Sequence, residues 1–297
     1  MKTSPACLPC FMRQAKFAAA LTTDSKSLQD RIIQESSALI SSFPLDISPP
    51  ENAVALYRLI AELSDNPDIF SGLKKISNRA ALKMVASLAS PIRSSGNKLE
   101  TAARLAIAGN IIDYGAQQEF DMKKTVERSL ALPLAINDLE FFSSDLAKAR
   151  NILYLADNCG ELAFDRLLIE TLDRPVTLAV KDRPILNDAL LEDAVDCGLD
   201  SLCRLISNGA GCPGTPLDFC SKEFKNAFRE TDLIISKGQG NFETLSETPG
   251  PIYFLLMVKC PVVAEHINEI RASASGTTVK TGDMVALKHP LYDAKRG

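Results

Sequence analysis

Oxygen-rich side chains stand at the ends of two apolar segments of this sequence. Asp157 and Asn158 directly follow the apolar segment 152–156, and Asp188 comes after the apolar segment 176–180. Carboxylate and amide oxygens are hard ligands that suit Mg²⁺ or Mn²⁺, with water completing an octahedron. We therefore predict that Asp157, Asn158 and Asp188 bind a divalent metal ion.

The stretch "KGQGN", residues 237–241, follows another apolar segment and has the chemistry of a phosphate site. Lys237 offers a positive charge, while Gly238 and Asn241 offer a backbone N–H group and an amide for phosphate oxygens. Asn208, which follows the segment 201–207, is a further candidate for orienting a ligand. These groups are expected to contact the substrate.

A cation, carboxylates and a phosphate site together indicate metal-assisted phosphoryl chemistry. The catalytic residues are then Asp157, Asp188 and Lys237. The nucleophile is either a water molecule or an unligated carboxylate, and the sequence does not choose between them.

The same residues also have a structural interpretation. Asp157 is a suitable N-cap for a following helix, with Glu161 reinforcing its first turn, and Asn187 or Asp188 can start the next helix. Polar clusters at four successive segment ends favour a site over simple capping. Glu161 and Asp165 are assigned to the start of a helix, to the surface or to positions behind the metal ligands.

A helical stripe in "AARLAIAGNIIDYG", residues 102–115, ends in Asn110 and Asp113. Their spacing puts both on one helix face with small alanine residues. One interpretation is a close helix contact in which the two polar side chains are merely hydrogen-bonded. The other is that this helix leans over the cleft and supplies Asn110 and Asp113 to the substrate.

The pattern of elements changes near residue 150. Before it, apolar residues recur at three- and four-residue steps, which is typical of amphipathic helices. After it, continuous apolar segments alternate with helical ones, which indicates parallel strands covered on both faces. The expected strands lie within 151–156, 176–180, 201–207, 232–236 and 251–258.

The predicted fold class is therefore α/β, with a helical N-terminal region over 1–148 and a Rossmann-like, doubly wound, mostly parallel sheet over 149–297. Open α/β sheets bind ligands outside the carboxyl ends of their strands, at the point where the strand order reverses. The polar residues that follow each strand are thus expected to meet at one edge.

Composition limits the partners. The chain has 297 residues, 33 Lys and Arg against 37 Asp and Glu, and no apolar stretch long enough to cross a membrane. We expect neither a nucleic-acid nor a membrane partner, but a small phosphorylated metabolite. The N-terminal segment lacks an uninterrupted apolar region, so a cytoplasmic location is expected. The oligomeric state is open.

Eight cysteines include a single CxxC pair, Cys7 and Cys10. A closed zinc site needs four ligands, and no second CxxC supplies them. The pair is either apolar packing in a first helical turn or a redox or metal site, with Cys159 as a possible third partner.

Several motifs, in order and spacing, resemble the metal-dependent damage-control phosphatases, first catalogued as a domain of unknown function. They are "CLPC", "LAIAGNIIDYG", "LYLADNCGELAFDRLLIETL", "VKDRPILNDALLEDA", "SNGAGCPGTPLD", "DLIISKGQGNFETL" and "FLLMVKCPVVAEHI". The likeness covers nearly the whole chain and points to the branch with an N-terminal cysteine pair.

The resemblance implies a metal site at Asp157, Asn158 and Asp188, with Lys237 and Asn241 in the phosphate-binding stretch. It also implies hydrolysis of phosphate esters of small metabolites, such as sugar phosphates or damaged side products, with cobalt, nickel, manganese or magnesium. Two alternatives remain: an S-adenosylmethionine-dependent carboxyl methyltransferase, and a cysteine-dependent metal or redox binding protein. The absence of a glycine-rich turn after the first strand speaks against the methyltransferase.

Overall fold

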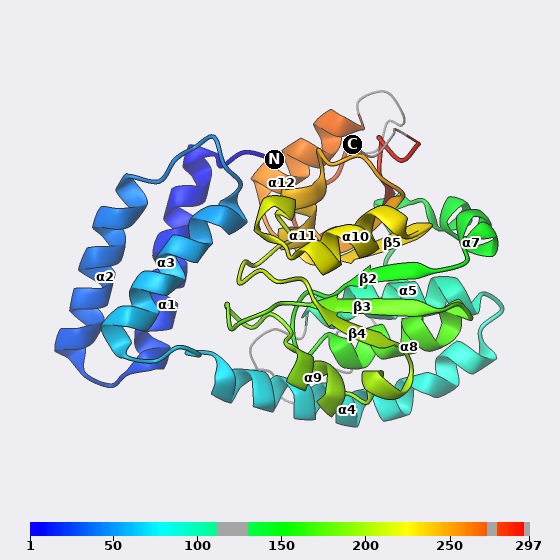
Figure 1. Cartoon of the computed structure of the whole chain (residues 1–297), viewed down its shortest axis with the longest axis horizontal. Coiled ribbons are helices and arrows are strands. Elements are labelled where there is room, and N and C mark those ends of the chain that lie inside the picture. Colours follow the sequence, from blue (N-terminus) through cyan, green and yellow to red (C-terminus); the bar gives the residue numbers. More distant parts are fainter. Residues whose placement is uncertain (112–129, 272–277, 294–297) are drawn as a thin grey trace.

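The structure, a computed structural model, describes residues 1–111, 130–271 and 278–293. Its centre is a sheet with helices on both faces, and a group of three helices stands to one side of it (Figure 1). Asp113 lies outside the described residues.

Seven strands form the sheet in the described part of the chain, in the order β1-β7-β6-β5-β2-β3-β4. β2 to β6 are parallel to one another, whereas β7 is antiparallel to β6 and β1 is parallel to β7. This confirms the α/β class and the mostly parallel sheet. The strands are β1 (Ile136–Asn137), β2 (Ile152–Leu155), β3 (Val176–Val180), β4 (Arg204–Ser207), β5 (Leu233–Lys237), β6 (Ile252–Met257) and β7 (Met284–Lys288).

Helices cover both faces of the sheet because its strands are apolar on both sides. In β2, Ile152 and Tyr154 pack into one hydrophobic cluster, and Leu153 and Leu155 pack into another. The first face carries α4 (Ser71–Ser94), α5 (Lys98–Ala108), α7 (Leu139–Lys148), α8 (Leu162–Leu172) and α9 (Leu191–Asp196). The second carries α10 (Lys222–Glu230), α11 (Gly238–Leu245) and α12 (Pro261–Ile270) (Figure 1).

Three N-terminal helices form a separate hydrophobic cluster: α1 (Leu8–Thr22), α2 (Lys26–Ser41) and α3 (Pro49–Ser64). α3 begins sharply because Ser48 and Glu51 form a capping box and prolines occupy its first turn. The described residues also form short 3-10 helices, namely η1 (Pro5–Cys7), η2 (Gly109–Ile111), η3 (Leu199–Ser201) and η4 (Leu217–Phe219).

The helical region and the sheet share a core across the predicted boundary at residue 148. α5 packs directly against α8, and β1, which lies before the boundary, pairs with β7. Residue 148 therefore marks the change in sequence pattern, while only α1 to α3 stand away from the sheet (Figure 1). The division into two domains stays a prediction.

The strand order places the carboxyl ends of β2 and β5 at the edge of the sheet where the sequence predicted a ligand site. From β2 the chain proceeds to β3 and β4 on one side, then crosses to β5 on the other side of β2. The carboxyl ends of β2 and β5 thus flank the point where the strand order reverses, the usual ligand position in such sheets. No helix among the described residues is long and apolar enough to cross a membrane.

Candidate active site

Two strand-end loops are joined by backbone hydrogen bonds that bring the expected metal ligands together. The N–H of Cys159 donates to the carbonyl of Asn187, and the N–H of Ala189 donates to that of Asp157, both at 2.9 Å. Between these two bonds, Asn158 and Asp188 form an antiparallel bridge. The loops after β2 and β3 therefore place Asp157, Asn158 and Asp188 side by side.

Asp157 is buried against the start of α11. Its Oδ2 accepts hydrogen bonds from Asn110 Nδ2 at 3.0 Å and from Asn158 Nδ2 at 3.1 Å. A Cβ atom added to Gly238 would lie 1.9 Å from this oxygen, and Gly238 has φ of +76°. Glycine is therefore required at position 238, both for the left-handed backbone and for the close approach of the carboxylate.

The capping interpretation is wrong for these residues. α8 begins at Leu162, and its N-cap residue Glu161 makes no capping hydrogen bond through its side chain. α9 begins only at Leu191, so neither Asn187 nor Asp188 caps it.

Asn158 is oriented by two carboxylates. Its Nδ2 donates to Glu161 Oε1 at 2.6 Å as well as to Asp157. Both N–H donors of the amide are thereby used, and its Oδ1 remains as the group that can bind a cation.

Lys237 lies at the end of β5 but is fully buried. Its Nζ donates to Asp165 Oδ1 at 2.6 Å, to Glu161 Oε2 at 3.1 Å and to the carbonyl of Ala106 in α5 at 2.9 Å. An ammonium group has three donors, and all three are used. The expected role of Lys237 as a phosphate-binding cation is thus corrected: it neutralises two buried acids beneath the site.

Of the roles considered for Glu161 and Asp165, the helix start and a position behind the metal-ligand candidates fit the structure, whereas the surface position does not, because both residues are buried. Asp165 is not at the surface; its Oδ1 accepts from Lys237 and from the hydroxyl of Tyr154 at 2.7 Å. Burial lowers the pKa of Lys237, but the charges of Asp165 and Glu161 outweigh it and raise that pKa above its ordinary value. The ammonium group is therefore firmly held as a cation.

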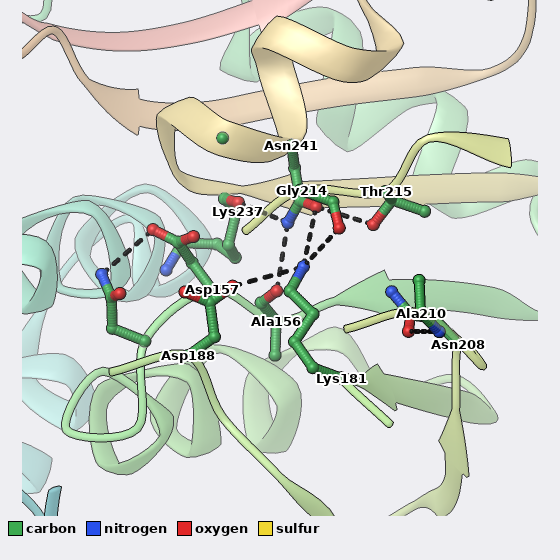
Figure 2. A network of polar contacts seen from close by, with 12 residues as sticks. Ala156, Asp157, Lys181, Asp188, Asn208, Ala210, Gly214, Thr215, Lys237 and Asn241 are labelled. Atoms are coloured by element: carbon green, nitrogen blue, oxygen red, sulfur yellow. Dashed lines mark hydrogen bonds and ion pairs between the residues drawn. The ribbon is translucent and has the colours of Figure 1, made fainter. Parts of the chain in front are cut away.

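Lys181, directly after β3, belongs to the network although it was not among the predicted site residues. Its buried Nζ donates to the carbonyl of Gly214 at 2.9 Å and to Asn241 Oδ1 at 3.3 Å, and lies 3.6 Å from Asp188 Oδ2 (Figure 2). It positions Asp188 and offsets part of its charge. The one sequence feature that could have identified Lys181 as a site residue was its position directly after an expected strand.

Asn241 ties three strand-end segments together. Its Nδ2 donates to the carbonyls of Ala156 and Lys237, and its Oδ1 accepts from Thr215 and Lys181 (Figure 2). All four hydrogen-bonding positions of the amide are occupied. The predicted substrate contact is corrected accordingly: this side chain is a buried brace.

Asn208 is likewise corrected. It is buried, and its Oδ1 accepts from the backbone N–H of Ala210 at 2.8 Å, which shapes the loop after β4 (Figure 2). It does not line the cleft that contains the metal-ligand candidates.

Asn110 lies in a close helix contact and is hydrogen-bonded there, as the first interpretation of its helical stripe expected. A Cβ on the neighbouring Gly109 would come within 3.0 Å of Phe164, so the helices pack closely there. Asn110 Nδ2 also donates to Asp157 and Glu161. It holds the acids in place, and its predicted contact with substrate stays a prediction.

The acids at this edge carry more negative charge than their surroundings balance. Burial raises the pKa of Asp188 well above its ordinary value, and the charges of Asp157 and Glu161 raise it further against the effect of Lys181. Burial likewise raises the pKa of Glu161 to about 8, with Lys237 opposing and Asp157 and Asp165 contributing. Asp188 Oδ2 has no hydrogen-bond partner. A divalent cation between these groups fits both observations.

A cleft of about 440 Å³ exposes the three ligand candidates. The walls come from α1 and the start of α3, from the first turns of α11, and from residues 259–262 after β6. Arg13 and Lys259 are exposed cations on these walls. A larger cavity of about 620 Å³, between α3 and residues 183–186, contains none of the three ligand candidates, so the chemistry is assigned to the smaller cleft.

Cys7 and Cys10 line this cleft together with Cys260. Cys159 does not join them, because its buried thiol points to the carbonyl of Lys74 in α4, 3.8 Å away. Cys159 as the third partner is therefore wrong. Among the residues that the structure describes, no three His, Cys, Asp or Glu side chains are placed to hold a metal ion; the predicted ligand set joins two carboxylates to the amide of Asn158.

The chain is similar to known proteins along nearly its whole length. The model of the damage-control phosphatase ARMT1-like domain matches residues 3–274. The chain belongs to this family. A damage-control phosphatase from Pyrococcus horikoshii is 36% identical over 275 residues, covering 90% of this chain and 94% of that protein. One from Archaeoglobus fulgidus is 32% identical, covering 96% and 99% respectively.

A solved structure shows the damage-control phosphatase fold directly. The crystal structure of a Pyrococcus horikoshii protein of the same family, described as a DUF89 family protein, has a TM-score of 0.87 and 33% sequence identity. The match covers 97% of this chain and 99% of that one. The helices and the mostly parallel sheet are therefore shared along nearly the full length.

Proposed function

We propose that this member of the damage-control phosphatase family hydrolyses phosphate monoesters of small metabolites with the help of a divalent metal ion. One observation carries the proposal: two strand-end loops bring Asp157, Asn158 and Asp188 together on the wall of a cleft, where Lys181 offsets only part of the charge of the two carboxylates. The names of the two archaeal relatives support the same reaction class.

The ligands of the metal are Asp157, Asn158 and Asp188, and the ion is manganese, nickel, cobalt or magnesium. When bound there, it supplies Lewis-acid stabilisation of the phosphoryl oxygens and activation of water. The chain contributes the orientation of its ligands. Asn110 fixes Asp157, Glu161 turns the Asn158 amide so that its oxygen faces a cation, and Lys181 holds Asp188.

The start of α11 supplies the phosphate site. The first N–H groups of a helix have no acceptor within the helix, and they favour anions. Gln239 and Gly240, in this first turn, line the cleft beside the ligand candidates. The exposed Lys259 adds a cation on the same wall. Lys237 acts indirectly, by keeping Glu161 in place.

Further parts of the proposal rest on the sequence. The substrate is a small phosphorylated metabolite rather than a nucleic acid or a membrane component, and the protein acts in the cytoplasm. "CLPC" places it in the branch with an N-terminal cysteine pair. A methyltransferase is disfavoured because acids line the cleft after β2, where the carboxylate of S-adenosylmethionine would be repelled.

The experiment is phosphate release from a panel of sugar and nucleotide phosphates, with Mn²⁺, Ni²⁺, Co²⁺ or Mg²⁺ and with a chelator. Activity should require the added ion, and Asp157→Ala and Asp188→Ala should lower kcat by at least about a thousandfold. Asp218→Ala, an exposed acid on the loop after β4, is the matched control. Chelator-resistant activity, or full activity in either variant, would refute the proposal.

A further inference from the structure

Glu243 is a carboxylic acid of the cleft that the proposed reaction has not used. It lies on α11, its residue is 8% exposed, and it lines the same cleft as Asp157, Asn158 and Asp188. Unlike the acids beneath the site, it forms no salt bridge with a lysine or arginine side chain in the described structure. Its Oε1 accepts a hydrogen bond from Gln239 Nε2 at 2.9 Å.

The other buried acids around the site have partners that fix their roles. Asp157 and Asp188 are the proposed metal ligands, while Glu161 and Asp165 neutralise Lys237. Glu243 is therefore the carboxyl group that remains to exchange a proton with a bound substrate.

Helix geometry directs Glu243 toward the phosphate site. It follows Gly240 by three residues and Gln239 by four, so all three share one face of α11. The Cα–Cβ bonds of a helix tilt toward its N-terminus, and one turn is about 5.4 Å long. Glu243 therefore lies on the same cleft-lining face of α11 as Gln239 and Gly240, about one turn beyond the first N–H groups.

The charges around Glu243 come from several elements. Asp157 faces it from the end of β2 and Lys259 from the end of β6, while the ammonium group of Met1 is also close. The thiols of Cys7, at the end of η1, and of Cys260, before α12, are its other titratable neighbours. Burial raises the pKa of Glu243 to about 7, Asp157 contributes to the rise, and the bond from Gln239 opposes it.

We propose that Glu243 is the general acid that protonates the leaving oxygen of the phosphate ester. The inference rests on the proposed phosphatase activity. Water oxygen bonds to phosphorus as the ester P–O bond breaks, and the carboxyl proton passes to the departing oxygen to give an alcohol. The proton released by the attacking water restores the acid through solvent.

The test compares two esters and two Glu→Gln variants in the full chain with Mn²⁺. A sugar phosphate has an alkoxide leaving group that needs protonation, whereas p-nitrophenyl phosphate has a stable one that does not. Glu243→Gln should lower kcat for the sugar phosphate by about a hundredfold or more, and for p-nitrophenyl phosphate by less than about threefold. Glu269→Gln, on the neighbouring α12 with a 77% exposed side chain, should change neither.

The wild-type pH profile gives a second readout that does not depend on a variant folding. The acid must be protonated, so kcat for the sugar phosphate should fall as pH rises through its pKa, and the p-nitrophenyl profile should lack that limb. Equal losses on both esters in Glu243→Gln, or the same basic limb for both, would overturn the general-acid role and leave the phosphatase intact. A wild-type protein inactive on every ester with every ion would overturn both.

Discussion

The sequence allowed us to predict which residues lie at this site, but not which groups their side chains contact. Placing Asp157, Asn158 and Asp188 near one another needed only the rule that parallel strands end at one edge. The direction of Lys237 depends on a carbonyl of α5 and two acids of α8, residues distant in sequence. No local pattern encodes such packing, so a buried lysine looked like a substrate-binding one.

Lys237→Met tests this structural role. Removing one partner of a buried ion pair leaves the other charge unpaired, which costs about 3–5 kcal/mol. Urea denaturation should show a loss of that order in the free energy of unfolding, whereas Lys222→Met, at an exposed position, should show almost none. A variant as stable as the wild type but inactive would instead return Lys237 to direct phosphate binding.

Proton release tests the charge balance of the acids. Burial favours the protonated forms of Glu161 and Asp188: it raises the pKa of Glu161 to about 8 and that of Asp188 well above its ordinary value. Binding a cation favours the ionised forms, so protons leave, and affinity rises with pH until the acids are fully ionised. Titration calorimetry with Mn²⁺ in buffers of different ionisation enthalpy should show this release. Identical heats in all buffers would contradict it.

Strands and helices were the most predictable level of the structure. Continuous apolar segments correctly indicated β2 to β6, because strands buried on both faces need apolar residues throughout. β1 has only two residues and thus no periodicity, and β7 lies outside the strand–helix alternation. The decisive element is the β5–α11 junction, where Gly238 lets Asp157 approach the helix start.

Gly238→Ala tests whether glycine is needed at this position for the close approach of Asp157, and not only for the left-handed backbone conformation. Gly282 also has a positive φ, +93°, but an added Cβ there meets nothing within 4 Å. Each substitution should cost about 1–3 kcal/mol of stability through the backbone. Only Gly238→Ala should also displace Asp157 and weaken Mn²⁺ binding by about tenfold or more, as measured by calorimetry. Equal Mn²⁺ affinities in the two variants would contradict the role of the junction.

At the scale of the whole molecule, the cleft lies between the N-terminal helices and the sheet, two parts of the chain with different sequence patterns. α1 and α3 form one wall, and the strand-end loops form the other. Sequence periodicity predicts the helices but not where they dock, because docking depends on contacts between distant segments. This explains why Cys260, rather than Cys159, lies with Cys7 and Cys10 in the cleft.

A bound ion should stabilise the molecule as a whole. A ligand at a hundred times its Kd adds about 2.7 kcal/mol to the free energy of unfolding if it binds only the folded state. Mn²⁺ should therefore raise Tm by several degrees over chelator-treated protein in a thermal scan. Asp157→Ala should abolish the rise, and an undiminished rise in that variant would place the ion elsewhere.

The most direct test is the position of the ion itself. Crystals grown with Mn²⁺ and measured near the manganese absorption edge should give one strong anomalous peak within bonding distance of Asp157, Asn158 and Asp188, and Asp188→Ala crystals should lack it. A peak among Cys7, Cys10 and Cys260 instead, or no peak at the acid cluster in active protein, would contradict the proposed metal site.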